Sequence, residues 1–176
     1  MITAAVEAAT ASAQDWWEAP AVVAGLIAAF AAVFTLWVNG RRARVERQRV
    51  LFADAFGAIV EYREYPYIVR RRSADGPAEE RARINRALSD VQHRLNRYEA
   101  LLKVENKDVG KAYSALLKET RAVAGGEIRR GWEQQPASDD SSMSIADVDL
   151  TPLGQHDDAY LTAVRKHLRL VPSWLP

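Results

Sequence analysis

The chain of 176 residues contains no cysteine, so disulfide bonds, thiolate metal sites and a cysteine nucleophile are all excluded. It contains only three histidines, at positions 93, 156 and 167. Several motifs of common chemistries are also missing, namely the G-x-S-x-G elbow, the phosphate-binding loop, G-x-G-x-x-G and H-E-x-x-H. The sequence therefore predicts no enzyme and no cofactor.

The sequence also contains no complete set of residues spaced to bind a metal ion. Asp90 and His93 have the i, i+3 spacing of carboxylate–histidine ligands in helical bundles. Such a centre needs a second pair of this kind on a facing helix, and no other Asp-x-x-His or Glu-x-x-His occurs. The aspartates of residues 134–158 lack the glycine and terminal glutamate of a calcium-binding loop. We therefore expect no metal site.

Charge is distributed unevenly along the chain, although its formal net value is only +1. Residues 1–40 carry −3, residues 41–130 carry +8, residues 131–158 carry −7 and residues 159–176 carry +3. Arginine outnumbers lysine by 19 to 5 and alanine is abundant, a composition typical of a GC-rich bacterial or phage genome. Each segment therefore has to be interpreted by itself.

Ionisable side chains are absent from residues 19–38. Twenty residues form a helix of about 30 Å, the thickness of the hydrocarbon core of a bilayer. Trp16 and Trp17 flank one end and Trp37 the other, as expected for the two headgroup layers. A cleaved signal peptide would need basic residues before the apolar run and a small-x-small cleavage site after it, and neither is present. We predict a transmembrane helix over residues 19–39.

Basic residues follow this apolar run at once, whereas the short segment before it holds three acids and no lysine or arginine. Because basic residues are retained on the cytoplasmic side, the pattern predicts a single-pass protein of the inner cell membrane. Residues 1–18 are then an extracytoplasmic tail. The arginines expected to set this topology and to contact anionic lipid headgroups are Arg41, Arg42, Arg44, Arg47 and Arg49.

Small residues recur every four positions within the predicted span, at Ala21, Gly25 and Ala29. Residues so spaced share one helix face and let two backbones approach closely. This face is the expected packing surface of a homo-oligomer.

Helical periodicity continues through residues 40–133, which we expect to form a cytoplasmic stalk and bundle. The stalk helix should end or kink at Pro66. A second helix follows the Gly-Pro turn, and its apolar residues at alternating spacings of four and three indicate a coiled coil or antiparallel bundle. The members of this seam are Ile84, Leu88, Val91, Leu95, Tyr98 and Leu102. A third helix begins near Val109 and should fray or bend at Gly125 and Gly126.

Tyrosine and arginine alternate around the expected end of the stalk helix. Two interpretations remain open for this segment: a packed elbow, or a pocket for phosphate or for an acidic partner. The expected partner surface comprises Tyr65, Tyr67, Arg70, Arg71 and Arg72. Arginines also line the next helix, but without aromatic side chains or a nucleic-acid-reading module, so no nucleic acid is expected as a partner.

Proline, serine and aspartate dominate residues 134–156, a composition that predicts a mobile acidic loop. Residues 157–176 should form a C-terminal helix and tail, with Tyr160, Leu161, Val164 and Leu168 on one helix face.

The predicted fold is therefore all-α: one N-terminal transmembrane helix that continues into a cytoplasmic stalk and a small antiparallel helical bundle or coiled coil. This organisation favours a membrane-anchored interaction or scaffold protein that presents its bundle to a cytoplasmic protein partner. One alternative is a self-assembling membrane-acting factor of the phage-exclusion or toxin type. Another is a membrane-anchored enzyme whose site has no recognised motif.

Overall fold

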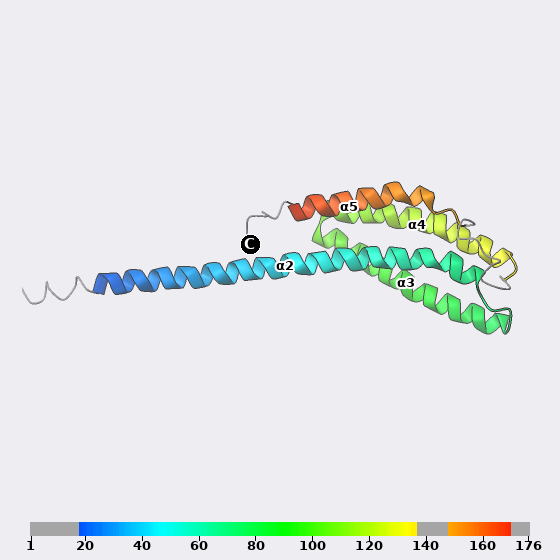
Figure 1. Cartoon of the computed structure of the whole chain (residues 1–176), viewed down its shortest axis with the longest axis horizontal. Coiled ribbons are helices and arrows are strands. Elements are labelled where there is room, and N and C mark those ends of the chain that lie inside the picture. The colour runs from blue at the N-terminus through cyan, green and yellow to red at the C-terminus, as the bar shows by residue number, and fades with distance from the viewer. Residues whose placement is uncertain (1–17, 137–147, 170–176) are drawn as a thin grey trace, which may run out of the picture. The chain divides into compact units, whose positions relative to one another are not determined.

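The computed structural model describes residues 18–136 and 148–169, and this part of the chain is all-α with no strand. Its helices are α2 (Glu18–Arg70), α3 (Pro77–Glu105), α4 (Lys107–Glu133) and α5 (Gly154–Arg169) (Figure 1). A short 3-10 helix, η3 (Thr151–Leu153), directly precedes α5. The chain divides into two compact units between Glu46 and Arg47, so α2 contributes to both. The predicted all-α fold is confirmed.

The first unit consists, in its described part, of the apolar beginning of α2. Its large side chains are exposed, with Phe30 at 74% and Leu36 at 72%. Among the described residues, α2 is the one helix that is long and apolar enough to cross a membrane, and none of its most apolar 18-residue window is buried within the protein. A continuous apolar surface of this kind is characteristic of a segment that contacts lipid or another apolar surface.

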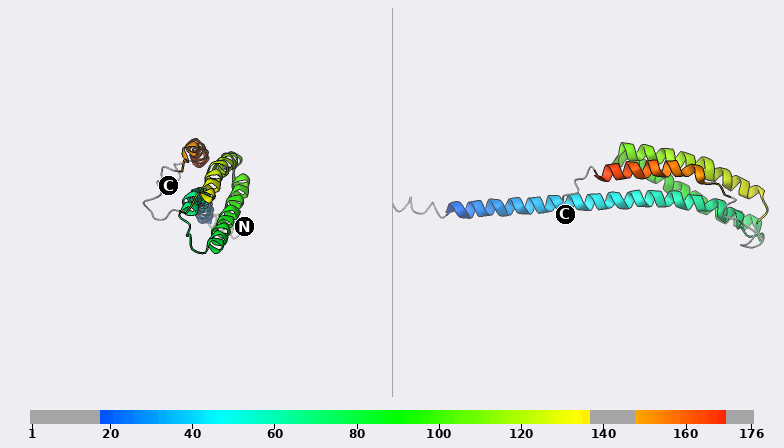
Figure 2. Two further views of the ribbon diagram at one scale, coloured as in Figure 1. Left: turned by 90° about the vertical axis from the view of Figure 1, so that its right-hand side faces the viewer. Right: turned by 45° about the horizontal axis from the view of Figure 1, so that its top comes forward.

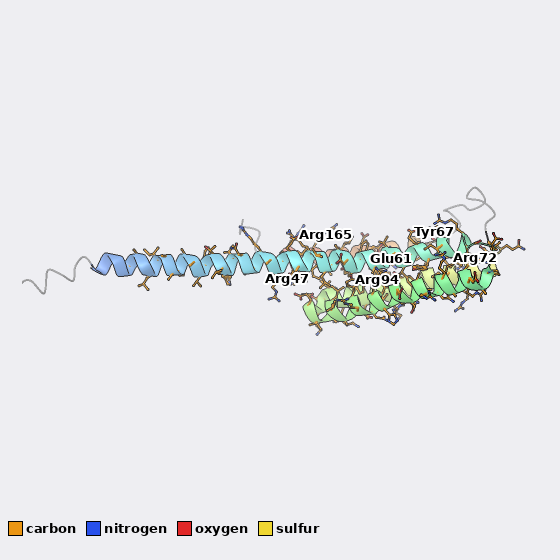
Figure 3. The ribbon with its side chains drawn as sticks, turned by 90° about the horizontal axis from the view of Figure 1, so that it is seen from below. Arg47, Glu61, Tyr67, Arg72, Arg94 and Arg165 are labelled. Atoms are coloured by element: carbon orange, nitrogen blue, oxygen red, sulfur yellow. The ribbon has the colours of Figure 1, made fainter. Side chains whose placement is uncertain are left out.

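The second unit is a bundle in which α3, α4 and α5 pack alongside the second half of α2. Successive helices run in opposite directions, as Figures 1 and 2 show. Arg94 of α3 bonds to Glu61 of α2, and the two residues face each other across the helix pair in Figure 3. The guanidinium of Arg63 in α2 donates two hydrogen bonds, of 2.8 and 2.7 Å, to the carboxylate of Asp157 in α5. Together these contacts tie α2 to the helices on either side of it.

The predicted seam of α3 faces the interior of this bundle. Ile84, Val91, Leu95 and Leu102 are buried, with at most 1% of each side chain exposed. Leu88 and Tyr98 are half-buried and pack against the same core. The seam is therefore covered by helices of the same chain, chiefly by the buried face of α4. That face comprises Val109, Tyr113, Leu116, Leu117, Thr120, Ala124 and Ile128.

Two buried tyrosines, one on α4 and one on α5, bond to the backbone of α2 and hold both helices against it. The hydroxyl of Tyr113 donates to the carbonyl oxygen of Ala55 at 3.2 Å, and the hydroxyl of Tyr160 donates to the carbonyl oxygen of Phe52 at 2.9 Å. The two rings also meet edge to face, with centroids 5.6 Å apart. Burial raises the pKa of both hydroxyls above the ordinary value. Both side chains therefore remain neutral donors at neutral pH.

A single residue, Asn106, separates α3 from α4. Its backbone N–H bonds to the carbonyl of Leu102 and closes α3, while its side-chain oxygen accepts from the N–H groups of Asp108 and Val109 and starts α4. Gly110 lies one turn further on, where a Cβ would stand 2.7 Å from Cα of Lys103. The chain reversal is tight because this position has no side chain.

Pro66 was expected to end or kink the stalk helix, and the helix does not end there. Helix α2 continues through Pro66 to Arg70. Proline removes one helical hydrogen bond, but Val69, which is fully buried in the core, and the half-buried Ile68 hold the next turn against the bundle. The carbonyl of Tyr67 then accepts from the N–H of Arg71 and closes the helix.

The third helix was expected to fray or bend at Gly125 and Gly126, and it does not fray there, because α4 runs from Lys107 to Glu133. Buried side chains on both sides of the glycines, Ala124 and Ile128, keep the helix against the core. The pair costs helix propensity without interrupting the hydrogen-bonding pattern.

The C-terminal helix begins earlier than predicted, at Gly154. Part of the predicted loop over residues 134–156 is thus ordered: Val148 and Leu153 are buried, and the carboxylate of Asp149 accepts from the N–H of Thr151 at 3.0 Å. Two apolar anchors and a cap start η3 and α5 within a segment that is acidic on average. Residues 137–147 and 170–176 of the predicted loop and tail lie outside the described residues.

Candidate functional site

The arginines predicted to set the topology lie in α2 on both sides of the unit boundary. Arg42, Arg44, Arg47 and Arg49 are exposed. Arg41 is half-buried, with its guanidinium 5.6 Å from the ring centroid of Trp37. This cation–π contact joins the last aromatic residue of the apolar stretch to the first of the basic residues.

The predicted packing face of the span is open within the chain. Gly25 and Ala29 are exposed, and a Cβ placed at Gly25 would have no neighbour within 4 Å. The side chain of Ala21 and the whole tail of residues 1–17 lie outside the described residues. Another helix can approach this face without displacing any described side chain.

The structure divides the predicted partner surface into a buried and an exposed part. Tyr65 is 5% exposed and Arg70 is 7% exposed, so neither side chain can be reached by a partner, and the prediction was wrong for these two. They are buried because they face α3 and α4, on the core side of the last two turns of α2. Arg71 is exposed, and Tyr67 and Arg72, which Figure 3 labels, are half-buried in the same segment.

The burial of Arg70 is compensated by charge. Its guanidinium forms an ion pair with Oε2 of Glu127 at 3.3 Å. The other carboxylate oxygen of Glu127, Oε1, forms an ion pair with Nη1 of Arg130 at 2.7 Å. A buried charge is tolerated only when it is paired and hydrogen-bonded. Arg70 is therefore part of the structure of the bundle and is not a binding residue.

Arg72 is held in place by main-chain oxygens. Nη1 donates to the carbonyl of Val69 at 2.8 Å and to the carbonyl of Gly131 at 2.7 Å, and Nη2 donates to the carbonyl of Gln134. These acceptors come from the end of α2 and the end of α4, so Arg72 fastens the two helix ends together. Carbonyl groups satisfy the donors of a guanidinium but do not neutralise its charge.

Two arginines lie near the ring of Trp132 at this end of the bundle. The guanidinium carbon of Arg72 is 5.0 Å from the ring centroid, and that of Arg81 is 4.9 Å from it. The pKa of Arg72 lies below the ordinary value because its guanidinium is partly buried and because Arg81 repels it. The indole attracts both cations but cannot cancel their repulsion.

A shallow pocket opens beside these three side chains, with a volume of about 520 Å³. Ser73 and several small apolar residues complete its lining, namely Ala74, Pro77, Ala78 and Pro136. The pocket thus combines two cations, one aromatic ring and an apolar wall. We call it the Trp132 pocket.

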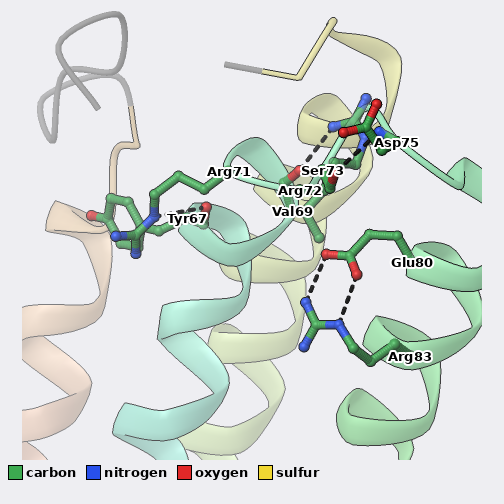
Figure 4. Close-up of polar contacts among 8 residues, drawn as sticks. All are labelled: Tyr67, Val69, Arg71, Arg72, Ser73, Asp75, Glu80 and Arg83. Atoms are coloured by element: carbon green, nitrogen blue, oxygen red, sulfur yellow. Dashed lines mark hydrogen bonds and ion pairs between the residues drawn. The ribbon is translucent and has the colours of Figure 1, made fainter. Parts of the chain in front are cut away.

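Glu80, an acid in the first turn of α3 near the Trp132 pocket, is engaged elsewhere. Glu80 accepts from Arg83 through both carboxylate oxygens at 2.7 Å, and this pairing holds the pKa of Glu80 below its ordinary value (Figure 4). In the same turn the hydroxyl of Ser73 accepts from the N–H of Asp75 at 3.0 Å. These bonds order the turn from α2 to α3, and within residues 18–136 and 148–169 no carboxylate pairs with Arg72 or Arg81.

Sequence reasoning identified Arg72 but missed Trp132 and Arg81. The arginine triplet at residues 70–72 marked the region, yet its three members have different roles. Arg81 and Trp132 are 51 positions apart, and the antiparallel order of the helices alone brings them together. The one signal in the sequence was a tryptophan near the end of a helix, beyond the apolar face that the spacing predicted.

Asp90 and His93, the predicted i, i+3 pair, are both exposed on α3. Within residues 18–136 and 148–169, no group of three or more His, Asp or Glu side chains is placed to hold a metal ion. Comparisons of the chain with models of protein families, with curated proteins and with solved structures find no match. Any assignment of function therefore depends on the surfaces described above.

Proposed function

We propose that the protein is a single-pass membrane-anchored interaction protein whose helical bundle binds a partner in the cytoplasm. The observation that carries this proposal is the contrast between the two units. No residue of the most hydrophobic window of the first unit is buried within the protein, whereas the second unit buries its own apolar core. An exposed apolar helix is stable in a bilayer, and a bundle with a filled core has polar faces left for binding.

The charge pattern supports an orientation with residues 1–18 outside the inner membrane of a bacterial cell and the bundle inside. Arginines follow the apolar stretch within a few residues and face solvent, where they can contact anionic headgroups. Anchoring raises the local concentration of the bundle at the membrane, so individually weak contacts with a partner become effective.

The absence of cysteine allows a direct test of this topology, because any introduced cysteine is the one reactive thiol in the chain. We expect Ala8→Cys to react with an impermeant maleimide on intact cells, and Ala115→Cys, on the exposed side of α4, to react only after the cells are lysed. The reverse labelling pattern would refute the cytoplasmic bundle. Protection of both positions in intact cells would refute a span.

The partner is tested by solubilising the tagged full chain from its native membrane in a mild detergent and measuring the mass of the intact assembly. A second protein in fixed ratio supports an interaction protein. A closed assembly of identical chains supports instead the alternative of a self-assembling membrane factor, for which the open face at Gly25 and Ala29 offers the contact. In that case Gly25→Leu should reduce the copy number, whereas Leu36→Ala should not.

A further inference from the structure

The Trp132 pocket has an unbalanced charge. Glu127 is shared by Arg70 and Arg130, and Glu80 is bound by Arg83. The other acids at these helix ends, Asp75, Glu79 and Glu133, are exposed and form no ion pair with Arg72 or Arg81 within the described part of the chain. Among the described residues, two guanidinium groups therefore lie near one indole ring, and no carboxylate is paired with either of them.

The arrangement of the two arginines is costly without a ligand. Each cation–π contact is favourable, but the two like-charged guanidinium groups repel each other. Arg72 cannot rotate away, because it holds the carbonyls of Val69 and Gly131. Arg81 is exposed on α3 and can move. An anion placed between them would bind both and would turn the repulsion into attraction.

We propose that the Trp132 pocket binds a phosphate monoester group. The two guanidinium groups carry two positive charges, which match a phosphate monoester of about −1.5 to −2 at neutral pH better than a single carboxylate. The forked N–H donors of Arg81 fit phosphate oxygens in pairs, and Arg72, whose Nη atoms are held by carbonyls, contributes its positive charge. The apolar wall of Ala74, Pro77 and Ala78 then accommodates the organic part of the ligand beside the ring of Trp132. This inference rests on the pocket alone and stands apart from the proposed membrane anchoring.

The phosphate could belong to a soluble organic phosphate or to the headgroup of a phospholipid with a terminal phosphate. The recognition chemistry is the same for both sources, because the pocket contacts the phosphate and the atoms next to it. An open pocket of about 520 Å³ has room for a small headgroup or a small metabolite.

The test uses the full chain in neutral detergent micelles, with isotope-labelled tryptophan observed through the indole N–H signals in NMR. The sequence has five tryptophans, and Trp132→Phe identifies the signal of the pocket by its loss. We expect inorganic phosphate, and then glycerol 3-phosphate, to shift this signal in a saturable way with a midpoint on the order of 1 mM. Acetate at the same ionic strength should require at least about tenfold more.

The decisive variant is Arg81→Gln, because this side chain is exposed and its described contact is with Trp132. It should weaken phosphate binding by about tenfold or more while the helical content is unchanged. Arg86→Gln is the matched control, since Arg86 is an exposed arginine of the same helix that does not line the pocket. The control should bind phosphate like the parent.

Two further arms separate the sources of the phosphate. The full chain is placed in nanodiscs of phosphatidylcholine with and without phosphatidate, and the signal of Trp132 is compared with that in glycerol 3-phosphate. A shift with phosphatidate identifies a lipid headgroup, and a shift with glycerol 3-phosphate alone identifies a soluble phosphate. If phosphate and acetate act alike, or if Arg81→Gln binds phosphate as the parent does, the proposal is wrong.

Discussion

Gly110 tests how closely α3 and α4 approach each other at the Asn106 turn. In Gly110→Ala the new methyl group would stand 2.7 Å from Cα and 2.9 Å from the backbone nitrogen of Lys103. Both are backbone atoms, so no side-chain rotation relieves the clash, and the helices must separate. Overpacking of this kind costs about 1–3 kcal/mol, whereas alanine recovers up to about 1 kcal/mol of helix propensity. We expect a net loss of about 1–2 kcal/mol in the free energy of unfolding.

Gly126 provides the matched control in the same helix. A Cβ at Gly126 would have no neighbour within 4 Å, so Gly126→Ala gains helix propensity without a clash. This variant should be more stable than the parent by about 0.5–1 kcal/mol. The two glycine-to-alanine changes are therefore predicted to have opposite signs.

Chemical denaturation of the full chain in a mild detergent, followed by far-ultraviolet circular dichroism, measures both variants against the parent. The span should keep its helicity in detergent, so the transition reports the bundle. Equal stability of Gly110→Ala and Gly126→Ala would contradict the reasoning, because it would mean that α3 and α4 are not in backbone contact at Gly110.

Three further changes probe the core of the bundle. Leu95→Ala should lower the free energy of unfolding by about 2–5 kcal/mol because the side chain is fully buried. Leu101→Ala, at a position that is 41% exposed, should lower it by under about 1 kcal/mol. Similar losses for the two variants would mean that the α3 seam is not buried. Glu127→Gln should cost about 3 kcal/mol because it leaves a buried guanidinium without its carboxylate, whereas Glu133→Gln on the exposed side should change little in the same denaturation assay. Finally, the pKa of Tyr160 is raised by burial, so the stability that its neutral form contributes is complete below pH 10.0 and is lost as the pH rises toward the folded-state value. The melting temperature of the parent should therefore decrease steeply as the pH rises above 10.0, and the melting temperature of Tyr160→Phe should decrease less.

The sequence predicted the elements of this fold better than their ends. The spacing of Ile84 and Leu95 on α3 required a partner face, and Tyr113 on α4 supplies it, because both helices repeat their apolar residues every three or four positions. Pro66 was misleading, because local chemistry favours a break there and tertiary packing overrides it. Capping by Asp149 started the last helix within a segment whose average composition indicated a loop.

The Trp132 pocket was less accessible to sequence reasoning for a geometric reason. The pattern of Arg70 and Arg72 gave no indication that one would pair with Glu127 and the other contact Trp132, because Arg70 is the last residue of α2 and Arg72 lies beyond the end of that helix. Arg81 had the pattern of an ordinary residue on the exposed face of a helix. Its role depends on where the end of α4 lies, and that position is set by the Asn106 turn.

The turn at Asn106 also has a consequence for the order in which the bundle assembles. Ser114 bonds to Glu99 across this turn, and the two residues are 15 positions apart, whereas the bond from Tyr160 to Phe52 joins residues that are 108 positions apart. Closing a short loop loses less chain entropy than closing a long one, so contacts between α3 and α4 can form early and without the rest of the chain. Helix α5 can pair with α2 only after the chain has been made as far as Tyr160. The residues that line the Trp132 pocket all lie between Arg72 and Pro136, so the pocket contains no residue of α5, the helix that pairs last.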